Sequence, residues 1–290
     1  MMTQTNLLIT GATGSVGTQL VKKLVGSNVS FRALVRTREQ GDLMSDLPQV
    51  ELVVGDLSDP GSLASALEGI DKAFLLTNSS EHAEQLQLNF VNAAHKAGVS
   101  QIVKLSQLAA CVTSPVRFLR YHAVVENRIQ ALGFNYTFLR PNLFMQGLTA
   151  FGPYIKYEGK FYGSLGDARV SAVDTRDIAA VAAATLTEPG HQNKVYNITG
   201  PQAITYAEMA DSLSRILEKQ IAYVDLSPEQ MQGALTVAGF PAWQIGGLIE
   251  DYAHYSKGEA AGVFSTVKDI TGHDPIRFEQ FVQDYRTFFS

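Results

Sequence analysis

A glycine-rich turn that directly follows a short apolar strand constrains this chain more than any other feature. Leu7–Thr10 has the composition of a buried strand, and Gly11, Gly14 and Gly17 follow in a GxxGxxG pattern that opens a helix. A bound pyrophosphate needs close backbone approach, unpaired N–H groups and the positive end of a helix dipole. The turn therefore predicts a nucleotide cradle, whereas a plain strand-to-helix turn is the alternative. The expected contacts come from Gly11, Thr13, Gly14, Ser15, Val16 and Gly17.

Apolar strand-like runs alternate with amphipathic helical stretches through the first half of the chain, which is typical of a parallel sheet covered on both faces. The predicted strands are Leu7–Thr10, Ser30–Val35, Glu51–Val54, Lys72–Leu76, Gln101–Leu105, Tyr136–Leu139 and Val195–Thr199. The predicted helices are Ser15–Gly26, Ser62–Leu67, Ala83–Ala97, Phe118–Leu132, Asp174–Leu186, Thr205–Leu217, Pro228–Ala238, Pro241–Tyr255 and Phe278–Phe288. We expect an α/β fold with a Rossmann-type, doubly wound parallel sheet and a smaller, mainly helical C-terminal lobe.

The domain boundaries follow from a change of pattern after Pro141, where glycines punctuate a region rich in Phe and Tyr. Residues 1–142 are expected to form the dinucleotide-binding domain, with residues 170–200 returning to it. Residues 143–169 and 201–290 are expected to form the substrate-side lobe.

Composition limits the classes of partner. The 290 residues carry a net charge of only −5, without long runs of like charge, so bulk electrostatics favour neither nucleic acid nor a membrane surface. The absence of a leader and of an apolar run of about 18 residues predicts a cytoplasmic protein. The single Cys111 excludes an internal disulfide and a cysteine-based zinc site. No metal site is expected, and the oligomeric state is left open.

The residue that ends the second predicted strand selects the cofactor. An acidic side chain there accepts hydrogen bonds from the ribose of NAD, but this chain has Arg36, about twenty residues beyond the glycine turn. A guanidinium matches a 2′-phosphate in charge and in fork geometry. We therefore expect NADP(H); a solvated surface arginine is the alternative.

Other polar residues follow the predicted strands, where ligand contacts gather in open α/β sheets. Asp56 and Leu57 follow the third strand, and a carboxylate there can accept a hydrogen bond from the adenine amino group. Further candidate cofactor contacts are Thr77, Asn78, Ser106 and Asn142, each of which could instead be a turn-forming polar residue.

The chain resembles the NmrA-like branch of the atypical and extended short-chain dehydrogenase/reductase superfamily. The resemblance rests on Thr10–Gly17, Leu34–Arg36, Gly55–Asp59, Tyr136–Asn142 and Val173–Ala179, and it covers nearly the whole chain. It is weakest over the C-terminal helices. The branch includes NADPH-dependent quinone, azo-dye and triphenylmethane-dye reductases, as well as regulators that bind the cofactor without known chemistry.

The resemblance implies a departure from the catalytic Tyr-x-x-x-Lys pair of the wider superfamily. When the chain is aligned on Glu126, Phe118 takes the tyrosine position and His122 takes the lysine position. Tyr121 has no lysine four residues on, so it is considered an acceptor-lining residue and not the acid. The dye and quinone reductases resemble this chain in their His-x-x-x-Glu pair. His122 is therefore the candidate catalytic residue, as proton donor or as a group that positions cofactor or acceptor.

These observations together predict an NADPH-dependent reductase of a conjugated acceptor such as a quinone or an azo or aryl dye. A quinone can accept hydride directly from a positioned nicotinamide. Besides Tyr121, the candidate acceptor contacts are Phe144, Met145, Phe151 and Tyr154. The alternatives are a non-catalytic NADP(H) sensor of the NmrA type and a nucleotide-sugar epimerase or dehydratase, the last disfavoured by Phe118 and His122.

Overall fold

The computed structural model describes residues 6–290. Residues 1–5, on which the expected absence of a leader partly rests, lie outside the described part. The chain forms two compact units. The first unit comprises the chain up to Thr113, Leu119–Arg140 and Ile178–Tyr196, and the second comprises Ser114–Phe118, Pro141–Asp177 and Asn197–Ser290.

A seven-stranded sheet with the order β3-β2-β1-β4-β5-β6-β8 organises the first unit. Its neighbouring strands from β3 to β6 run parallel. The strand order reverses between β1 and β4, and ligands of such sheets bind at the carboxyl ends of strands near this switch point. The strands are β1 (Leu7–Ile9), β2 (Phe31–Val35), β3 (Val50–Val54), β4 (Lys72–Leu75), β5 (Gln101–Leu105), β6 (Asn135–Pro141) and β8 (Lys194–Ile198). The predicted doubly wound fold is confirmed, and each of the seven predicted strands exists with small shifts at its ends.

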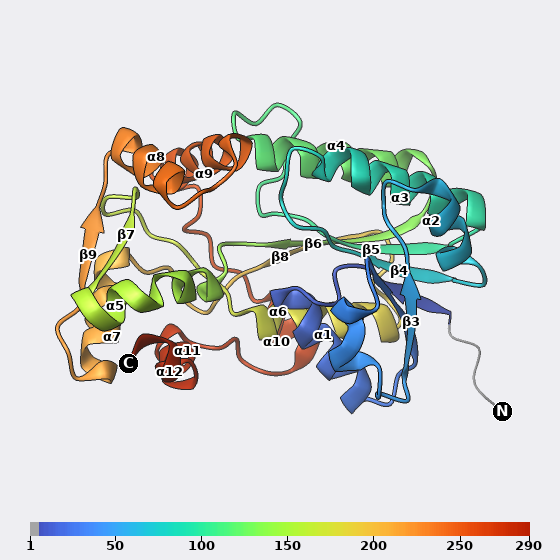
Figure 1. The fold of residues 1–290 in the computed structure, drawn as a ribbon, viewed down its shortest axis with the longest axis horizontal. Helices are drawn as coiled ribbons and strands as arrows, with labels where there is room; N and C mark the ends of the chain where they lie inside the picture. Colours follow the sequence, from blue (N-terminus) through green and yellow to red (C-terminus); the bar gives the residue numbers. More distant parts are fainter. Residues whose placement is uncertain (1–5) are drawn as a thin grey trace. The chain divides into compact units, whose positions relative to one another are not determined.

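Helices cover both faces of this sheet, as Figure 1 shows. One face carries α2 (Pro60–Leu67), α3 (Ala83–Ala97) and α4 (Arg117–Ala131), and the other carries α1 (Ser15–Gly26) and α6 (Thr175–Thr187). Helix α1 packs through a buried stripe made of Val16, Gly17, Leu20, Val21 and Leu24. This spacing is the helical period that the sequence displays.

The second unit is built around a cluster of buried aromatic rings, among them Phe161, Phe278, Phe281 and Phe289. Its helices are α5 (Gly152–Glu158), α7 (Tyr206–Leu217), α8 (Pro228–Val237), α9 (Ala242–Tyr255), α10 (Thr266–Thr271), α11 (Phe278–Asp284) and α12 (Arg286–Phe289). The 3₁₀ helices η1 (Glu39–Met44) and η2 (Met145–Phe151) lie in the first and second units respectively. The lobe is thus mainly helical, as expected.

Two details of the second unit differ from the sequence prediction. A two-stranded parallel sheet, β7 (Lys160–Gly163) with β9 (Ala222–Asp225), was not expected. The predicted helix Phe278–Phe288 is wrong as one element, because the backbone leaves helical geometry at Tyr285 (φ −103°, ψ 15°), between α11 and α12. The break lets Phe281 and Phe289 both reach the buried cluster.

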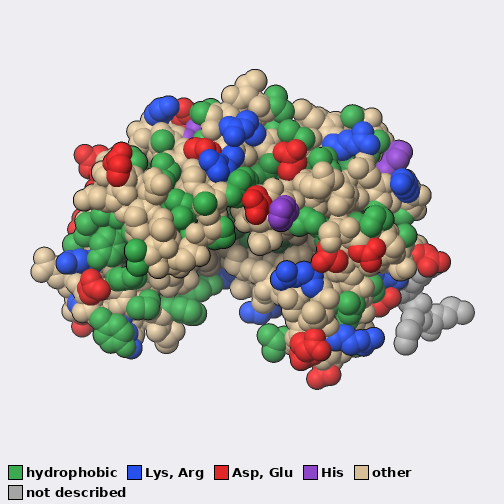
Figure 2. Space-filling view, turned by 45° about the horizontal axis from the view of Figure 1, so that its top comes forward, with side chains coloured by type: hydrophobic (Ala, Val, Ile, Leu, Met, Phe, Trp, Pro, Cys, Tyr) green, Lys and Arg blue, Asp and Glu red, His purple; other side chains and the backbone are tan. Residues whose placement is uncertain are grey.

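Basic and acidic side chains are interspersed on the face drawn in Figure 2, where the described residues form no continuous basic stretch. Within residues 6–290, no helix is both long and apolar enough to cross a membrane.

Candidate functional site

The turn between β1 and α1 uses its glycines for different reasons. Gly11 has a φ of +65°, and a Cβ there would lie 2.8 Å from the Leu76 carbonyl oxygen. A Cβ on Gly17 would lie 2.0 Å from the Gly11 carbonyl oxygen, so only glycine allows the helix to approach the strand so closely. A Cβ on Gly14 would meet nothing nearer than the Gly11 carbonyl oxygen at 3.4 Å, an ordinary contact. Internal packing therefore does not demand glycine at position 14, and its predicted role is to let a ligand approach the backbone closely.

The N-terminus of α1 is open. Gly14 is its N-cap, no side chain caps the first turn, and the first turn has no acidic residue. Thr13, Gly14 and Ser15 are exposed, whereas Val16 and Gly17 are buried in the packing of the helix. Unpaired N–H groups and the positive dipole end favour an anion at such a terminus. This geometry fits the pyrophosphate of a dinucleotide.

Arg36 and Asp56 follow the neighbouring strands β2 and β3. Arg36 is exposed, and its backbone N–H donates to Gln40 Oε1 at 3.3 Å. Asp56 Oδ1 accepts from Ser58 N at 2.7 Å and from Ser58 Oγ at 2.6 Å. These bonds, with a smaller contribution from the charge of Arg36, lower the pKa of Asp56. Leu57 packs against the core between the sheet and its helices, so its contact with a nucleotide stays a prediction.

The ends of β4 and β5 carry three of the predicted polar residues. Thr77 Oγ1 accepts from Gln87 Nε2 at 2.7 Å, while Asn78 is exposed. Ser106 is buried and donates from Oγ to Glu126 Oε1 at 2.6 Å. The geometry therefore gives Thr77 and Ser106 partners inside the first unit, and only Asn78 presents an exposed side chain.

A buried polar cluster lies between β5, β6 and α4. Glu126 is 3% exposed and accepts from Ser106 Oγ and from the Arg140 guanidinium, whose Nε lies 3.0 Å from Oε1. Next to it, Lys104 Nζ lies 2.7 Å from His122 Nδ1. Lys104 is fully buried and His122 is 8% exposed. The predicted pair of His122 and Glu126 thus shares a helix face, but each binds a different cation.

The sequence analysis proposed a role for neither Arg140 nor Lys104 of this cluster, and Lys104 is the more unusual of the two. Burial lowers its pKa to about 7, although the Glu126 carboxylate opposes this shift. Burial also lowers the pKa of His122 well below its usual value, and the charges of Lys104 and Arg140 add to the effect. At neutral pH the imidazole is therefore neutral and acts as a hydrogen-bonding group, not as a cationic acid.

Tyr121 stacks on this cluster from the same helix. Its ring centroid lies 4.2 Å from that of His122, and its hydroxyl lies 3.3 Å from Ser79 Oγ. The tyrosine is only 4% exposed. The planes of the two rings are tilted by 34° to each other, and contact of Tyr121 with an acceptor stays a prediction.

In the second unit, Asn142 is held by the protein itself. Its Nδ2 donates to Ser171 Oγ at 2.9 Å and to the Ala260 carbonyl at 2.8 Å, and its Oδ1 accepts from Leu143 N. These bonds engage both ends of the amide, and the expected cofactor contact of Asn142 stays a prediction.

The predicted acceptor-lining residues of the second unit differ in exposure. Met145 is 4% exposed and belongs to the aromatic core. Phe144 and Phe151 are half-buried, and Tyr154 is exposed with its ring edge-on to Tyr162. Phe144, Phe151 and Tyr154 thus keep surface for a ligand, and Met145 does not.

A cavity of about 810 Å³ also lies in the second unit, beside β9 and the start of α8. The sequence pattern gives no sign of it, because β9 itself was not expected. It is lined by Ser164–Ala168, Asp225–Pro228, Met231, Ile249, Ala253 and Ser256.

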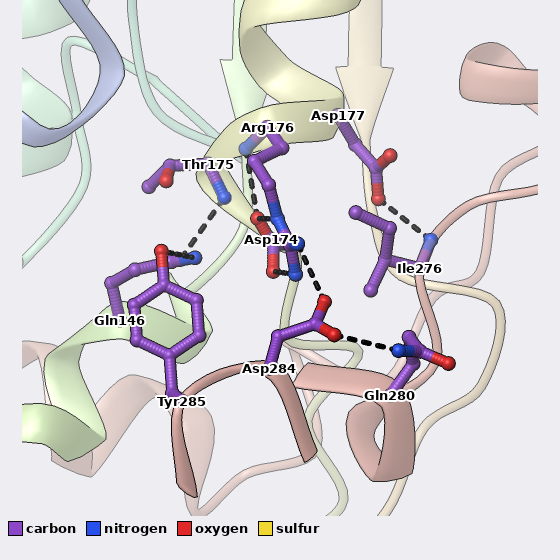
Figure 3. Close-up of polar contacts among 9 residues, drawn as sticks. All are labelled: Gln146, Asp174, Thr175, Arg176, Asp177, Ile276, Gln280, Asp284 and Tyr285. Atoms are coloured by element: carbon purple, nitrogen blue, oxygen red, sulfur yellow. Dashed lines mark hydrogen bonds and ion pairs between the residues drawn. The ribbon is translucent and has the colours of Figure 1, made fainter. Parts of the chain in front are cut away.

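Asp174, Arg176 and Asp177 take part in ion pairs and hydrogen bonds within the second unit, which Figure 3 shows. Asp174 is fully buried and accepts from Arg176 Nε at 2.9 Å and from Nη2 at 2.7 Å, and Arg176 Nη1 reaches Asp284 at 2.6 Å. Asp177 accepts from the backbone of Ile276 at 2.8 Å. These contacts hold the C-terminal segment against the start of α6, which identifies the motif as scaffold.

Comparison with known proteins agrees with this arrangement. Residues 3–268 match the NmrA-like family. The chain is 35% identical to an NAD(P)H azoreductase of Xenophilus azovorans over 98% of this chain and 99% of that protein. The structure of an Escherichia coli NADPH-dependent quinone oxidoreductase complexed with NADPH matches with a TM-score of 0.88 and 29% identity, over 97% of this chain and 99% of that one.

A third similar protein is named for a different substrate, a triphenylmethane dye. The Citrobacter triphenylmethane reductase complexed with NADP(H) matches with a TM-score of 0.85 and 28% identity, over 96% of this chain and 99% of that chain. The open helix terminus, the arginine after β2 and these full-length similarities together lead to one conclusion: this chain belongs to the NmrA-like family.

Proposed function

We propose that this protein is an NADPH-dependent oxidoreductase that reduces a conjugated small molecule such as a quinone or an azo or aryl dye. One observation carries the proposal: the uncapped N-terminus of α1 follows the strand β1, whose neighbour β2 is followed directly by the exposed Arg36. A dinucleotide with a 2′-phosphate places its two anionic groups at such a pair of sites. The acceptor class is supported by the azoreductase, quinone oxidoreductase and triphenylmethane reductase relatives.

Different residues of the chain bind the cofactor, donate a hydrogen bond to the acceptor and contact its rings. The backbone N–H groups of Ser15 and Val16 in the first turn of α1 bind pyrophosphate, whereas the Gly14 N–H is engaged by the Gly11 carbonyl at 3.0 Å. Arg36 binds the 2′-phosphate. When bound, NADPH supplies the hydride. His122, held by Lys104 at 2.7 Å, is the candidate hydrogen-bond donor to the acceptor oxygen or nitrogen. Phe144, Phe151 and Tyr154 offer aromatic surface on which a planar acceptor can stack.

Acceptor-dependent loss of NADPH absorbance tests this function. The purified protein should oxidise NADPH on addition of a 1,4-benzoquinone or an azo dye, and NADH far less efficiently. Tight binding of NADPH without turnover of any acceptor would instead indicate a non-catalytic sensor. Failure to bind either dinucleotide would exclude both functions. The cytoplasmic location and the absence of a nucleic-acid partner stay predictions.

A further inference from the structure

Lys104 occupies an unusual place for a lysine. In β5 its side chain shares a face with Ile102 and Ser106, and this face packs against α4, where His122 lies. The residue is 0% exposed. Burial of an ammonium group is costly unless specific partners receive it. The partners of Nζ are His122 Nδ1 at 2.7 Å and the Leu105 carbonyl at 3.1 Å.

The nearby carboxylate is already engaged. Glu126 accepts hydrogen bonds from Ser106 and Arg140, and Lys104 has no ion pair within 4.0 Å among residues 6–290. An ammonium group has donors and no acceptor, so it must meet His122 at an unprotonated Nδ1. The ring proton of the neutral imidazole then resides on Nε2. Within the described chain, the recorded hydrogen bond of the His122 ring is the one to Lys104.

We propose that Lys104 is a positioning and relay residue for His122: it holds the imidazole as the Nε2–H tautomer and passes a proton to Nδ1 when Nε2–H protonates the reduced acceptor. This inference rests on the proposed reductase function. The proton count closes, because the acceptor oxygen gains the Nε2 proton while Nδ1 gains one from the Lys104 ammonium. This transfer leaves Lys104 neutral and the imidazole protonated at Nδ1. A proton from solvent at Nε2 then lets Nδ1 return its proton to Lys104 at 2.7 Å, which restores the starting state. The hydride comes from NADPH.

The charges around the pair suit such a relay. Because burial brings the pKa of Lys104 to about 7, the amine can both hold and release a proton near neutrality. The lowered pKa of His122 keeps the imidazole neutral between transfers. The other groups that face the pair are the Glu126 carboxylate and the Arg140 guanidinium from α4 and β6, with the Tyr121 ring stacked on His122.

The tautomer can be measured without any turnover. Protein labelled with ¹⁵N-histidine contains 6 histidines, and the His122→Gln variant identifies the signals of His122. We expect a protonated Nε2 and a hydrogen-bonded, unprotonated Nδ1 at pH 6, where Lys104, with its pKa of about 7, is mainly in the ammonium form. The Lys104→Met variant should lose this preference, whereas the control Lys72→Met, which removes a half-buried lysine bonded to the Leu186 carbonyl, should keep it. A protonated Nδ1 in the unmodified protein, or an unchanged tautomer in Lys104→Met, overturns the inference.

The relay is tested separately by Lys104→Gln. A glutamine amide can still donate to Nδ1 but has no proton to release. With a quinone acceptor, we expect the tautomer to persist while kcat falls about 10-fold to 100-fold at constant KM, and the inflection of kcat near pH 7 to disappear. A pH profile identical to that of the unmodified protein excludes the relay. If no acceptor is turned over, the proposed function fails, and the tautomer measurement alone decides the role of Lys104 in positioning His122.

Discussion

The carbonyl oxygen of Gly11 lies 2.0 Å from the position that a Cβ on Gly17 would occupy, whereas a Cβ on Gly14 would lie 3.4 Å from the same oxygen. Two glycines of one motif therefore serve different purposes. Gly17 allows α1 to pack on the sheet, and we expect Gly14 to leave room for a ligand.

Alanine substitutions distinguish the packing role of Gly17 from the expected ligand-binding role of Gly14. Gly17→Ala should destabilise the protein by about 1–3 kcal/mol or more, because the helix must move away from the strand. Gly14→Ala should leave the unfolding midpoint in urea nearly unchanged and weaken NADPH binding measured by calorimetry. Equal loss of stability in the two variants would contradict this assignment, and so would unchanged NADPH affinity in Gly14→Ala.

Arg36→Ala tests the choice of cofactor. Loss of one charge-assisted contact costs roughly 1.5–3 kcal/mol, so NADPH affinity should fall about 10-fold to 100-fold while NADH affinity changes little. Calorimetric titration with both dinucleotides measures the ratio. Arg128→Ala, which removes another exposed arginine of the first unit, is the control and should alter neither affinity. If the affinity for NADH fell by the same factor as the affinity for NADPH, Arg36 would not contact the 2′-phosphate.

The helical period and the alternation of strands and helices were enough to place the sheet of the first unit. Helix α1 was predicted with its exact bounds, because its apolar stripe is regular and its glycine turn marks the start. The strands β7 and β9 were missed because neither displays a clear alternation of apolar and polar side chains or a continuous apolar run. Their pairing depends on the aromatic core that Phe161 and Tyr223 help to form.

For the candidate site too, the sequence predicts the features that depend on local spacing but not those that depend on tertiary packing. The glycine turn and the position of Arg36 directly after β2 could be predicted from the sequence because both depend on local spacing, and their contacts with a cofactor stay predictions. Lys104 could not be predicted, because lysine is almost never fully buried, and the sequence QIVKL of β5 does not show which face its lysine occupies. Its burial results from the packing of α4 over β5, which brings His122 from 18 residues away to the ammonium group.

Asp174→Asn should destabilise the protein strongly. The carboxylate is fully buried and receives the Arg176 guanidinium at two oxygens, and removal of one partner of a buried pair costs about 3–5 kcal/mol. Asp284→Asn removes the other partner of Arg176 at a half-exposed site, where about 0–1 kcal/mol is expected. Burial of Asp284 favours a higher pKa, but the bonds from Arg176 and Gln280 lower it overall. Urea unfolding of both variants at pH 7 measures the difference, and equal losses would contradict the assigned burial.

Lys104→Met should stabilise the protein at and below neutral pH. Burial holds the pKa of Lys104 at about 7 in the folded state, against 10.5 when the chain is unfolded. Between these values the unfolded state binds more protons, so the free energy of unfolding of the unmodified protein should rise with pH over this window. Below about pH 7, the folded state bears the full cost of an ammonium buried at this site, on the order of a few kcal/mol, and methionine removes it. The stability advantage of Lys104→Met should therefore be largest near pH 6 and shrink as the pH approaches 10. Urea denaturation of both proteins at several pH values, with Lys72→Met as control, measures this difference in the free energy of unfolding. A difference that does not change with pH would mean that Lys104 keeps its ordinary pKa in the folded protein.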